Sequence, residues 1–267
     1  MGDRISIEIS DGVADVRLAR PEKMNALDRD MFQALNDAAA RLADTKGLRA
    51  VTLSGEGRAF CAGLDFGSFQ QMGDGDRELV NRLTDRTHGL ANHAQNVAWA
   101  WRELPVPVIA AVHGVAFGGG CQIALGADVR LIAPDARMSV MEIKWGLVPD
   151  MAGLALMRGL IRDDVARELT YTGRQVTGQD AVDLGLATRV EADPRAAALA
   201  MAREIASKSP DAVRAAKRLL NLAADGDAAA ILLAESAEQE KLISSANQVE
   251  AVKAGLAGRD PRFEDVA

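Results

Sequence analysis

Residues 106–153 read VPVIAAVHGVAFGGGCQIALGADVRLIAPDARMSVMEIKWGLVPDMAG, and the rest of the chain is organised around this stretch. Its beginning, 108–112, is an apolar run typical of a buried strand, and it ends at Gly114. Three glycines, 118–120, then lead into an apolar helical pattern. A glycine-rich turn that opens a helix exposes backbone N–H groups at the positive end of the helix dipole. The stretch therefore predicts a site for an anion, or for an oxygen that becomes anionic during a reaction.

The second half of the same stretch contains two acidic residues. Glu142 is flanked by mostly apolar residues, and Asp150 follows eight positions later. An oxyanion site followed by a candidate base indicates an enzyme that enolises a carbonyl compound. Because Asp150 precedes an apolar helical run, it is also a candidate N-cap.

The composition limits the class of protein. With 267 residues, of which 48% are hydrophobic, the chain can bury a sizeable core. The net charge of −7 disfavours nucleic acid and anionic membranes as partners, and no run reaches the ~18 apolar residues of a membrane span. Three histidines offer little material for a metal site, and the common nucleotide-binding glycine patterns are absent. Two cysteines in apolar surroundings, without a signal-peptide pattern, predict a cytoplasmic location.

The N-terminal segments predict a mixed α/β protein. Residues 5–9 and 13–18 alternate with period two around Asp11-Gly12, which predicts a β-hairpin. Asp28 is a candidate N-cap for a helix that runs to about Thr45. Further along, we expect a buried strand at 48–54 and a long helix at about 78–103.

A shift in composition marks the C-terminal part. Asp193-Pro194 and Ser209-Pro210 each place a capping residue before a proline, which predicts two helix starts, and a last helical pattern spans 228–256. We therefore divide the chain into a core at 1–192 and a helical region at 193–267. The helical region is expected to pack on the core or on a neighbouring subunit.

Three motifs resemble those of the crotonase, or enoyl-CoA hydratase/isomerase, superfamily. They are FCAGLDF at 60–66, HGVAFGGGCQIALGADVRLIA at 113–133 and MEIKWGLVPDMAG at 141–153, in the order typical of the family. The resemblance implies an α/β fold, a ClpP/crotonase-like spiral of β-β-α units, with a C-terminal helical region that mediates trimers or hexamers made of two trimers. It also implies a coenzyme A thioester as substrate, with no permanently bound cofactor.

The resemblance also assigns roles to residues. The thioester oxygen would lie between the backbone N–H groups of Leu64 and Gly119, in agreement with the oxyanion site predicted above. Lys23 matches a loop that meets the coenzyme A phosphates or adenine. The other positions expected to contact coenzyme A or the acyl group are Ala26, Ala62, Asp65, Phe66 and Gly118.

The family's hydratases use two glutamates on the added water, and this chain departs from that pattern. The first position is Gln122 and the second is Glu142. An amide is no general base at neutral pH, although it can position a water molecule or a thioester. Asp150 matches an acidic residue of the dienoyl-CoA isomerases, in which carboxylates move protons between carbons. The predicted catalytic set of Glu142, Asp150 and Gln122 therefore favours double-bond isomerisation.

Two alternatives remain open. One is an enoyl-CoA hydratase in which Glu142 acts on water while Gln122 and Asp150 replace the missing glutamate. The other is a non-catalytic acyl-CoA-binding assembly module, in which Glu142 is dispensable.

Overall fold

The computed structural model describes residues 4–73 and 83–266. A six-stranded sheet forms its centre, in the order β1 (Ile5–Ser10), β2 (Val13–Leu18), β3 (Ala50–Gly55), β4 (Val108–Val112), β6 (Val129–Ile132) and β9 (Arg189–Val190). The first pair is antiparallel and the following pairs are parallel. The predicted hairpin is confirmed, because Asp11 and Gly12 both have positive φ, as a two-residue hairpin turn requires.

A second, three-stranded sheet consists of β5 (Val115–Phe117), β7 (Arg137–Ser139) and β8 (Val176–Thr177). The chain passes from the large sheet to the small one at Gly114, as the predicted end of the buried strand implied. This residue has φ +59°, and a Cβ atom there would lie 2.0 Å from the carbonyl oxygen of Arg58. Only glycine fits such a close approach of two backbones, so the sequence break has a steric cause.

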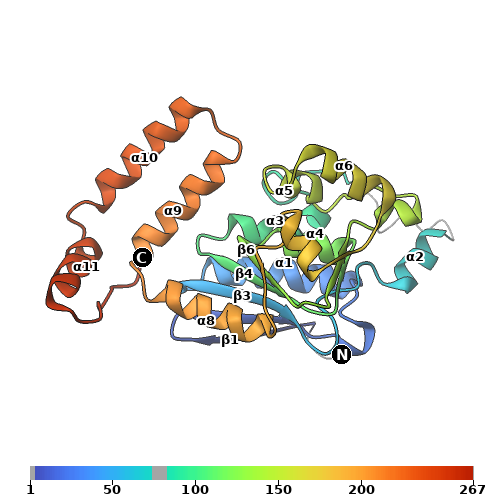
Figure 1. Ribbon diagram of the computed structural model, residues 1–267, viewed down its shortest axis with the longest axis horizontal. Helices are drawn as coiled ribbons and strands as arrows, with labels where there is room; N and C mark the ends of the chain where they lie inside the picture. Colours follow the sequence, from blue (N-terminus) through green and yellow to red (C-terminus); the bar gives the residue numbers. More distant parts are fainter. Residues whose placement is uncertain (1–3, 74–82, 267) are drawn as a thin grey trace.

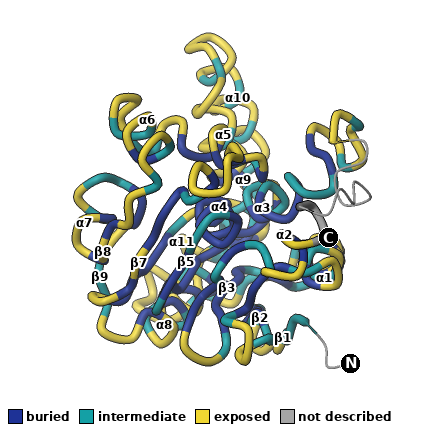
Figure 2. The backbone as a smooth tube through the Cα atoms, turned by 90° about the vertical axis from the view of Figure 1, so that its right-hand side faces the viewer, coloured by how far each residue is buried: buried dark blue, intermediate teal, exposed yellow. Residues whose placement is uncertain are grey.

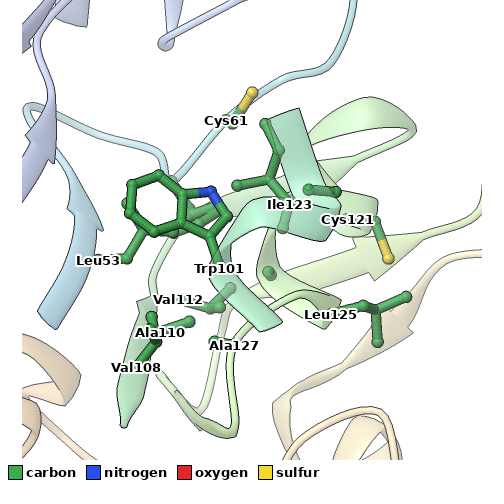
Figure 3. Close-up of a cluster of buried hydrophobic side chains, with 14 of the residues drawn as sticks. Leu53, Cys61, Trp101, Val108, Ala110, Val112, Cys121, Ile123, Leu125 and Ala127 are labelled. Carbon is green, nitrogen blue, oxygen red and sulfur yellow. The ribbon is translucent and has the colours of Figure 1, made fainter. Parts of the chain in front are cut away.

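Helices cover both faces of the large sheet (Figure 1). On one face lie α1 (Arg29–Ala43), α3 (His93–Glu103) and α4 (Gly119–Leu125), and on the other lies α8 (Pro194–Ala206). Period-two alternation along β4 separates the two cores, because Ala110 and Val112 face one set of helices while Ile109 and Ala111 face α8. Trp101 lies within the first core beside residues of β4 and α4 (Figure 3).

The shorter helices connect these layers. They are η1 (Pro21–Lys23), α2 (Phe66–Gly73), η3 (Glu142–Trp145), α5 (Gly153–Met157), α6 (Asp163–Thr172) and α7 (Gly178–Asp183). Asp28 caps α1 by accepting a hydrogen bond from Met31 N, as predicted. No helix in the described part of the chain is long and apolar enough to cross a membrane.

The expected helix at 78–103 is wrong in its first part. Residues 78–82 lie outside the described residues, and 83–92 form turns around a bridge between His88 and Ala91. The helix α3 begins after Asn92, which forms a capping box with Gln95. This box satisfies the first free N–H groups of the helix and stops it from extending toward the N-terminus.

The C-terminal helices α9 (Pro210–Ala223), α10 (Ala228–Leu242) and α11 (Ala246–Ala257) extend away from the layered body (Figure 1). The single pattern expected at 228–256 is thus two helices, separated at Ser244, which has φ +64°. Much of α10 is exposed (Figure 2), including apolar side chains. The division at residue 193 stays a prediction; α8, directly after it, packs on the sheet, which is one of the two arrangements expected for this region.

Candidate active site

The FCAGLDF motif and the triple-glycine turn lie against each other. Cys61 forms a parallel bridge with Ala116, and Phe117 N donates to the Cys61 carbonyl at 3.0 Å. Gly63 then turns with φ +88°, and a Cβ atom on it would lie 2.6 Å from the Phe117 carbonyl oxygen. Glycine is therefore required at position 63 both for its conformation and for the close contact of the two backbones.

This contact brings the two predicted oxyanion donors together. A Cβ atom on Gly63 would lie 3.8 Å from Gly119 N, and Leu64 is the next residue after Gly63. Leu64 forms a parallel bridge with Leu27, in which Leu27 N donates to Gly63 O at 2.8 Å and Asp65 N donates to Leu27 O at 3.0 Å. In this pattern the N–H of Leu64 itself points away from Leu27. Among the described residues, neither the Leu64 N–H nor the Gly119 N–H forms a hydrogen bond.

Glu142 lies beside this pair of donors. It begins η3, and its Oε1 would be 3.3 Å from a Cβ atom on Gly118. Oε1 accepts a hydrogen bond from Gln122 Nε2 at 2.7 Å, whereas Oε2 is buried and has no partner among the described residues. Burial raises the pKa of Glu142, the Gln122 hydrogen bond opposes the rise, and the nearby charge of Asp150 adds to it.

Gln122 is held by three hydrogen bonds. Its Oε1 accepts from Met151 N and Gly153 N, each at 2.9 Å, and its Nε2 donates to Glu142. The side chain is 1% exposed, so these contacts account for the orientation of the whole amide. The sequence placed Gln122 in the predicted catalytic set but gave no sign of these bonds, because the partners lie 20 to 31 positions along the chain.

Asp150 is the second carboxylate that the structure brings to the site. Solvent reaches its side chain, but the protein around it still raises its pKa by desolvation. The alternative prediction of an N-cap is wrong, because α5 begins after Ala152, which has φ +65° and forms no side-chain cap. The nearby charge of Asp150 raises the pKa of Glu142, while a joint catalytic role of the two carboxylates stays a prediction.

Asp65 is held within the site loop instead of projecting freely. Its Oδ2 accepts from Arg20 Nη1 at 2.7 Å, and its Oδ1 accepts from Gly67 N at 2.8 Å. Desolvation raises the pKa of Asp65, but these two bonds and the positive charges of Arg20 and Lys23 outweigh it, so the pKa is lowered. Lys23 is thus close to the FCAGLDF loop, on the exposed turn η1.

Arg20 and Asn25 are structural residues that hold this loop in place. Arg20 also donates to the carbonyl of Ala26 at 3.0 Å, which places it between both strands of the Leu27–Leu64 bridge. Asn25 is fully buried, with φ +56°, and its Nδ2 donates to the carbonyl oxygens of Glu56 and Ala59. Their long-range partners could not be read from the sequence.

The remaining predicted contacts flank the same region. Ala26 is buried, and Ala62 N donates to Met24 O at 2.9 Å. The ring of Phe66 meets that of Trp145 edge-to-face, with 5.8 Å between centroids, which joins the FCAGLDF segment to η3. Apolar side chains beyond Glu142 are exposed to solvent; they are Ile143, Trp145, Leu147, Val148 and Leu154. An apolar acyl group would find complementary surface here.

Known proteins resemble this chain in sequence and in fold. The profile of the enoyl-CoA hydratase/isomerase family matches residues 8–266. The putative enoyl-CoA hydratase/isomerase YngF of Bacillus subtilis is 32% identical over 260 residues, covering 95% of each chain. The mitochondrial Delta(3,5)-Delta(2,4)-dienoyl-CoA isomerase of Mus musculus is 30% identical over 268 residues, covering 94% of this chain and 78% of that protein.

The crystal structure of an enoyl-CoA hydratase from Bacillus anthracis superposes with a TM-score of 0.88 at 28% identity, covering 97% of this chain and 98% of that one. A putative enoyl-CoA hydratase from Streptomyces coelicolor gives the same TM-score at 33% identity, covering 98% and 94%. These likenesses confirm the crotonase-type α/β fold, while trimerisation stays a prediction. The chain therefore belongs to the enoyl-CoA hydratase/isomerase family of the crotonase superfamily.

Proposed function

We propose that this enzyme moves a double bond within the acyl chain of a coenzyme A thioester. The observation that carries the proposal is the state of Glu142, a buried carboxylate with one oxygen bonded to Gln122 and the other without a partner in the part of the chain that the structure describes. A single carboxylate suits the removal and return of one proton. The neutral amide at position 122 supplies no second base for activating water.

The proton transfer can be written for a 3-enoyl thioester. The Glu142 carboxylate takes a proton from C2, and the electrons of that C–H bond pass into a dienolate whose negative oxygen receives hydrogen bonds from Leu64 N–H and Gly119 N–H. The same carboxylic acid then gives the proton to C4. The thioester carbonyl re-forms and the double bond ends between C2 and C3, with no atom gained or lost. In a 3,5-dienoyl substrate, Asp150 begins protonated and gives its proton to the more distant carbon, and exchange with solvent then moves the proton from Glu142 back to Asp150.

The test uses three coenzyme A thioesters: a 2-enoyl, a 3-enoyl and a 3,5-dienoyl. Mass and ultraviolet absorbance are followed for the wild type, for Glu142→Gln and for a matched control, Glu103→Gln, whose carboxylate is exposed and accepts from Trp99. Double-bond migration without a gain in mass, lost only in Glu142→Gln, is the expected result. Addition of one water to the 2-enoyl substrate would support the hydratase alternative. Binding without turnover of any thioester would favour the acyl-CoA-binding module.

The proposal includes a homotrimeric assembly, or a hexamer of two trimers, with coenzyme A entering as part of the substrate. Apolar side chains on the C-terminal helices support it, because such surfaces are usually covered by a partner. The most exposed are Leu220, Leu232, Leu233 and Leu256. We also propose a cytoplasmic location, since Cys61 and Cys121 are free and buried thiols. Cell fractionation tests that location.

A further inference from the structure

We infer that Gln122 is a positioning residue that orients the Glu142 carboxylate and ties it to the turn that follows Asp150. The inference rests on the proposed function, because it assigns the contact that holds the base of that reaction in place. The Gln122 side chain bonds both to Glu142 and to the turn that follows Asp150. Its amide thus connects Glu142 with the main chain next to Asp150.

The orientation of the amide follows from its partners. Met151 N–H and Gly153 N–H are donors, so only the carbonyl oxygen of the Gln122 amide can accept their hydrogen bonds. The NH2 group must then face Glu142, where it occupies Oε1 and leaves Oε2. The same two bonds hold the Met151–Gly153 turn, whose middle residue, Ala152, has a positive φ. Asp150 immediately precedes this turn.

An isosteric glutamate at position 122 cannot reproduce this arrangement. Its second oxygen would face Glu142 Oε1 at about the present 2.7 Å, and two acceptors at that distance hold together only by sharing a proton. The other titratable groups that act on Glu142 are Asp150, whose negative charge favours its protonation, and the buried thiol of Cys121. Neither group compensates for the loss of the amide donor.

Two variants perturb the amide from opposite sides. Gln122→Glu removes the donor, and Gly153→Ala pushes the intact amide away, because a Cβ atom on Gly153 would lie 2.6 Å from Gln122 Oε1. The controls are matched in chemistry. Gln179→Glu alters an exposed amide that donates to Asp183 at 2.8 Å, and Gly255→Ala adds a Cβ atom that meets nothing within 4 Å.

Two measurements are made on each variant. The first is the pH profile of kcat for double-bond migration. The second is an infrared titration of the Glu142 carboxyl, identified by subtraction of the Glu142→Gln spectrum, which requires no turnover. In Gln122→Glu we expect the acid limb of kcat and the carboxyl midpoint to move up together by about one pH unit or more. In Gly153→Ala we expect the same direction with kcat reduced by about 10- to 100-fold, and in the controls no change.

An unchanged Glu142 midpoint in both site variants would overturn the inference, whatever happens to kcat. If Gln122→Glu fails to fold, Gly153→Ala alone decides, since it keeps every polar side chain of the site. Failure of the proposed function is a separate result, because it shows as an absence of double-bond migration in the wild type while the carboxyl titration can still respond to Gln122.

Discussion

Replacing Gly63 by alanine tests the proposed oxyanion site without touching a catalytic side chain. The new Cβ atom would lie 2.6 Å from the Phe117 carbonyl oxygen, and ordinary contact begins at 3.4 Å. The FCAGLDF loop and the triple-glycine turn must therefore separate by at least 0.8 Å, the difference between these two distances. The Leu64 and Gly119 donors lie on opposite sides of this contact, so the separation moves them apart.

The expected loss follows from the geometry of such donors. Removal of one oxyanion donor costs roughly 100- to 1,000-fold in kcat, about 2.7–4 kcal/mol, and we expect Gly63→Ala to approach 100-fold because the donor is displaced but still present. The assay is exchange of the C2 protons of a saturated acyl-CoA in D2O, followed by NMR. This exchange reports enolate formation directly, so it does not depend on which product the enzyme makes.

Gly159→Ala is the matched control. Gly159 has φ +84°, close to the φ +88° of Gly63, but a Cβ atom there meets nothing within 4 Å. Both variants carry the backbone strain of alanine in the left-handed region, about 1–2 kcal/mol, and only Gly63→Ala carries the steric contact. If the folded Gly63→Ala protein exchanged C2 protons as fast as Gly159→Ala, the backbone N–H groups would not be the groups that stabilise the enolate.

Three further predictions concern stability and assembly. Glu142→Gln raises the melting temperature more at pH 8 than at pH 5. Burial raises the pKa of Glu142, so its ionised form, which is present above that pKa, destabilises the folded state. Equal shifts of the melting temperature at the two pH values would contradict this. Lys217→Met lowers the free energy of unfolding in urea by about 3 kcal/mol, since Lys217 donates to Asp128 and to two buried carbonyl groups, and adding Asp128→Asn recovers part of the loss. Leu256→Asp dissociates the proposed trimer, as measured by light scattering, whereas Leu90→Asp, also exposed, leaves it intact.

Local sequence signals predicted the fold well where they were sufficient. The hairpin turn at Asp11-Gly12 and the caps at Asp28 and Asp193 act within a few residues, and the structure has each of them. The start of α3 was missed because apolar periodicity was given more weight than capping. The capping box of Asn92 and Gln95 is itself a local pattern, and it would have placed the start correctly.

The chemistry of the site depends on contacts that no local pattern encodes. The glycine-rich turn and Glu142 predicted an oxyanion site with a base nearby, and the resemblance to the crotonase superfamily assigned the two donors to Leu64 and Gly119. The bonds between Gln122 and the Met151–Gly153 turn connect residues about 30 positions apart in the sequence. The ion pair of Arg20 with Asp65 connects residues 45 positions apart. Such partners are determined by packing of the whole fold.

The amide of Gln122 and the carboxylate of Glu142 depend on each other. Burial disfavours the charge of Glu142, and the hydrogen bond from Gln122 is the side-chain contact that opposes this effect. A second carboxylate at the same place would remove that support and add a negative charge. Restoring the hydratase pattern by Gln122→Glu alone is therefore expected to give a proton-sharing pair in which Glu142 is less often ionised at neutral pH, and not a hydratase, because the two oxygens meet directly and leave no room for water between them.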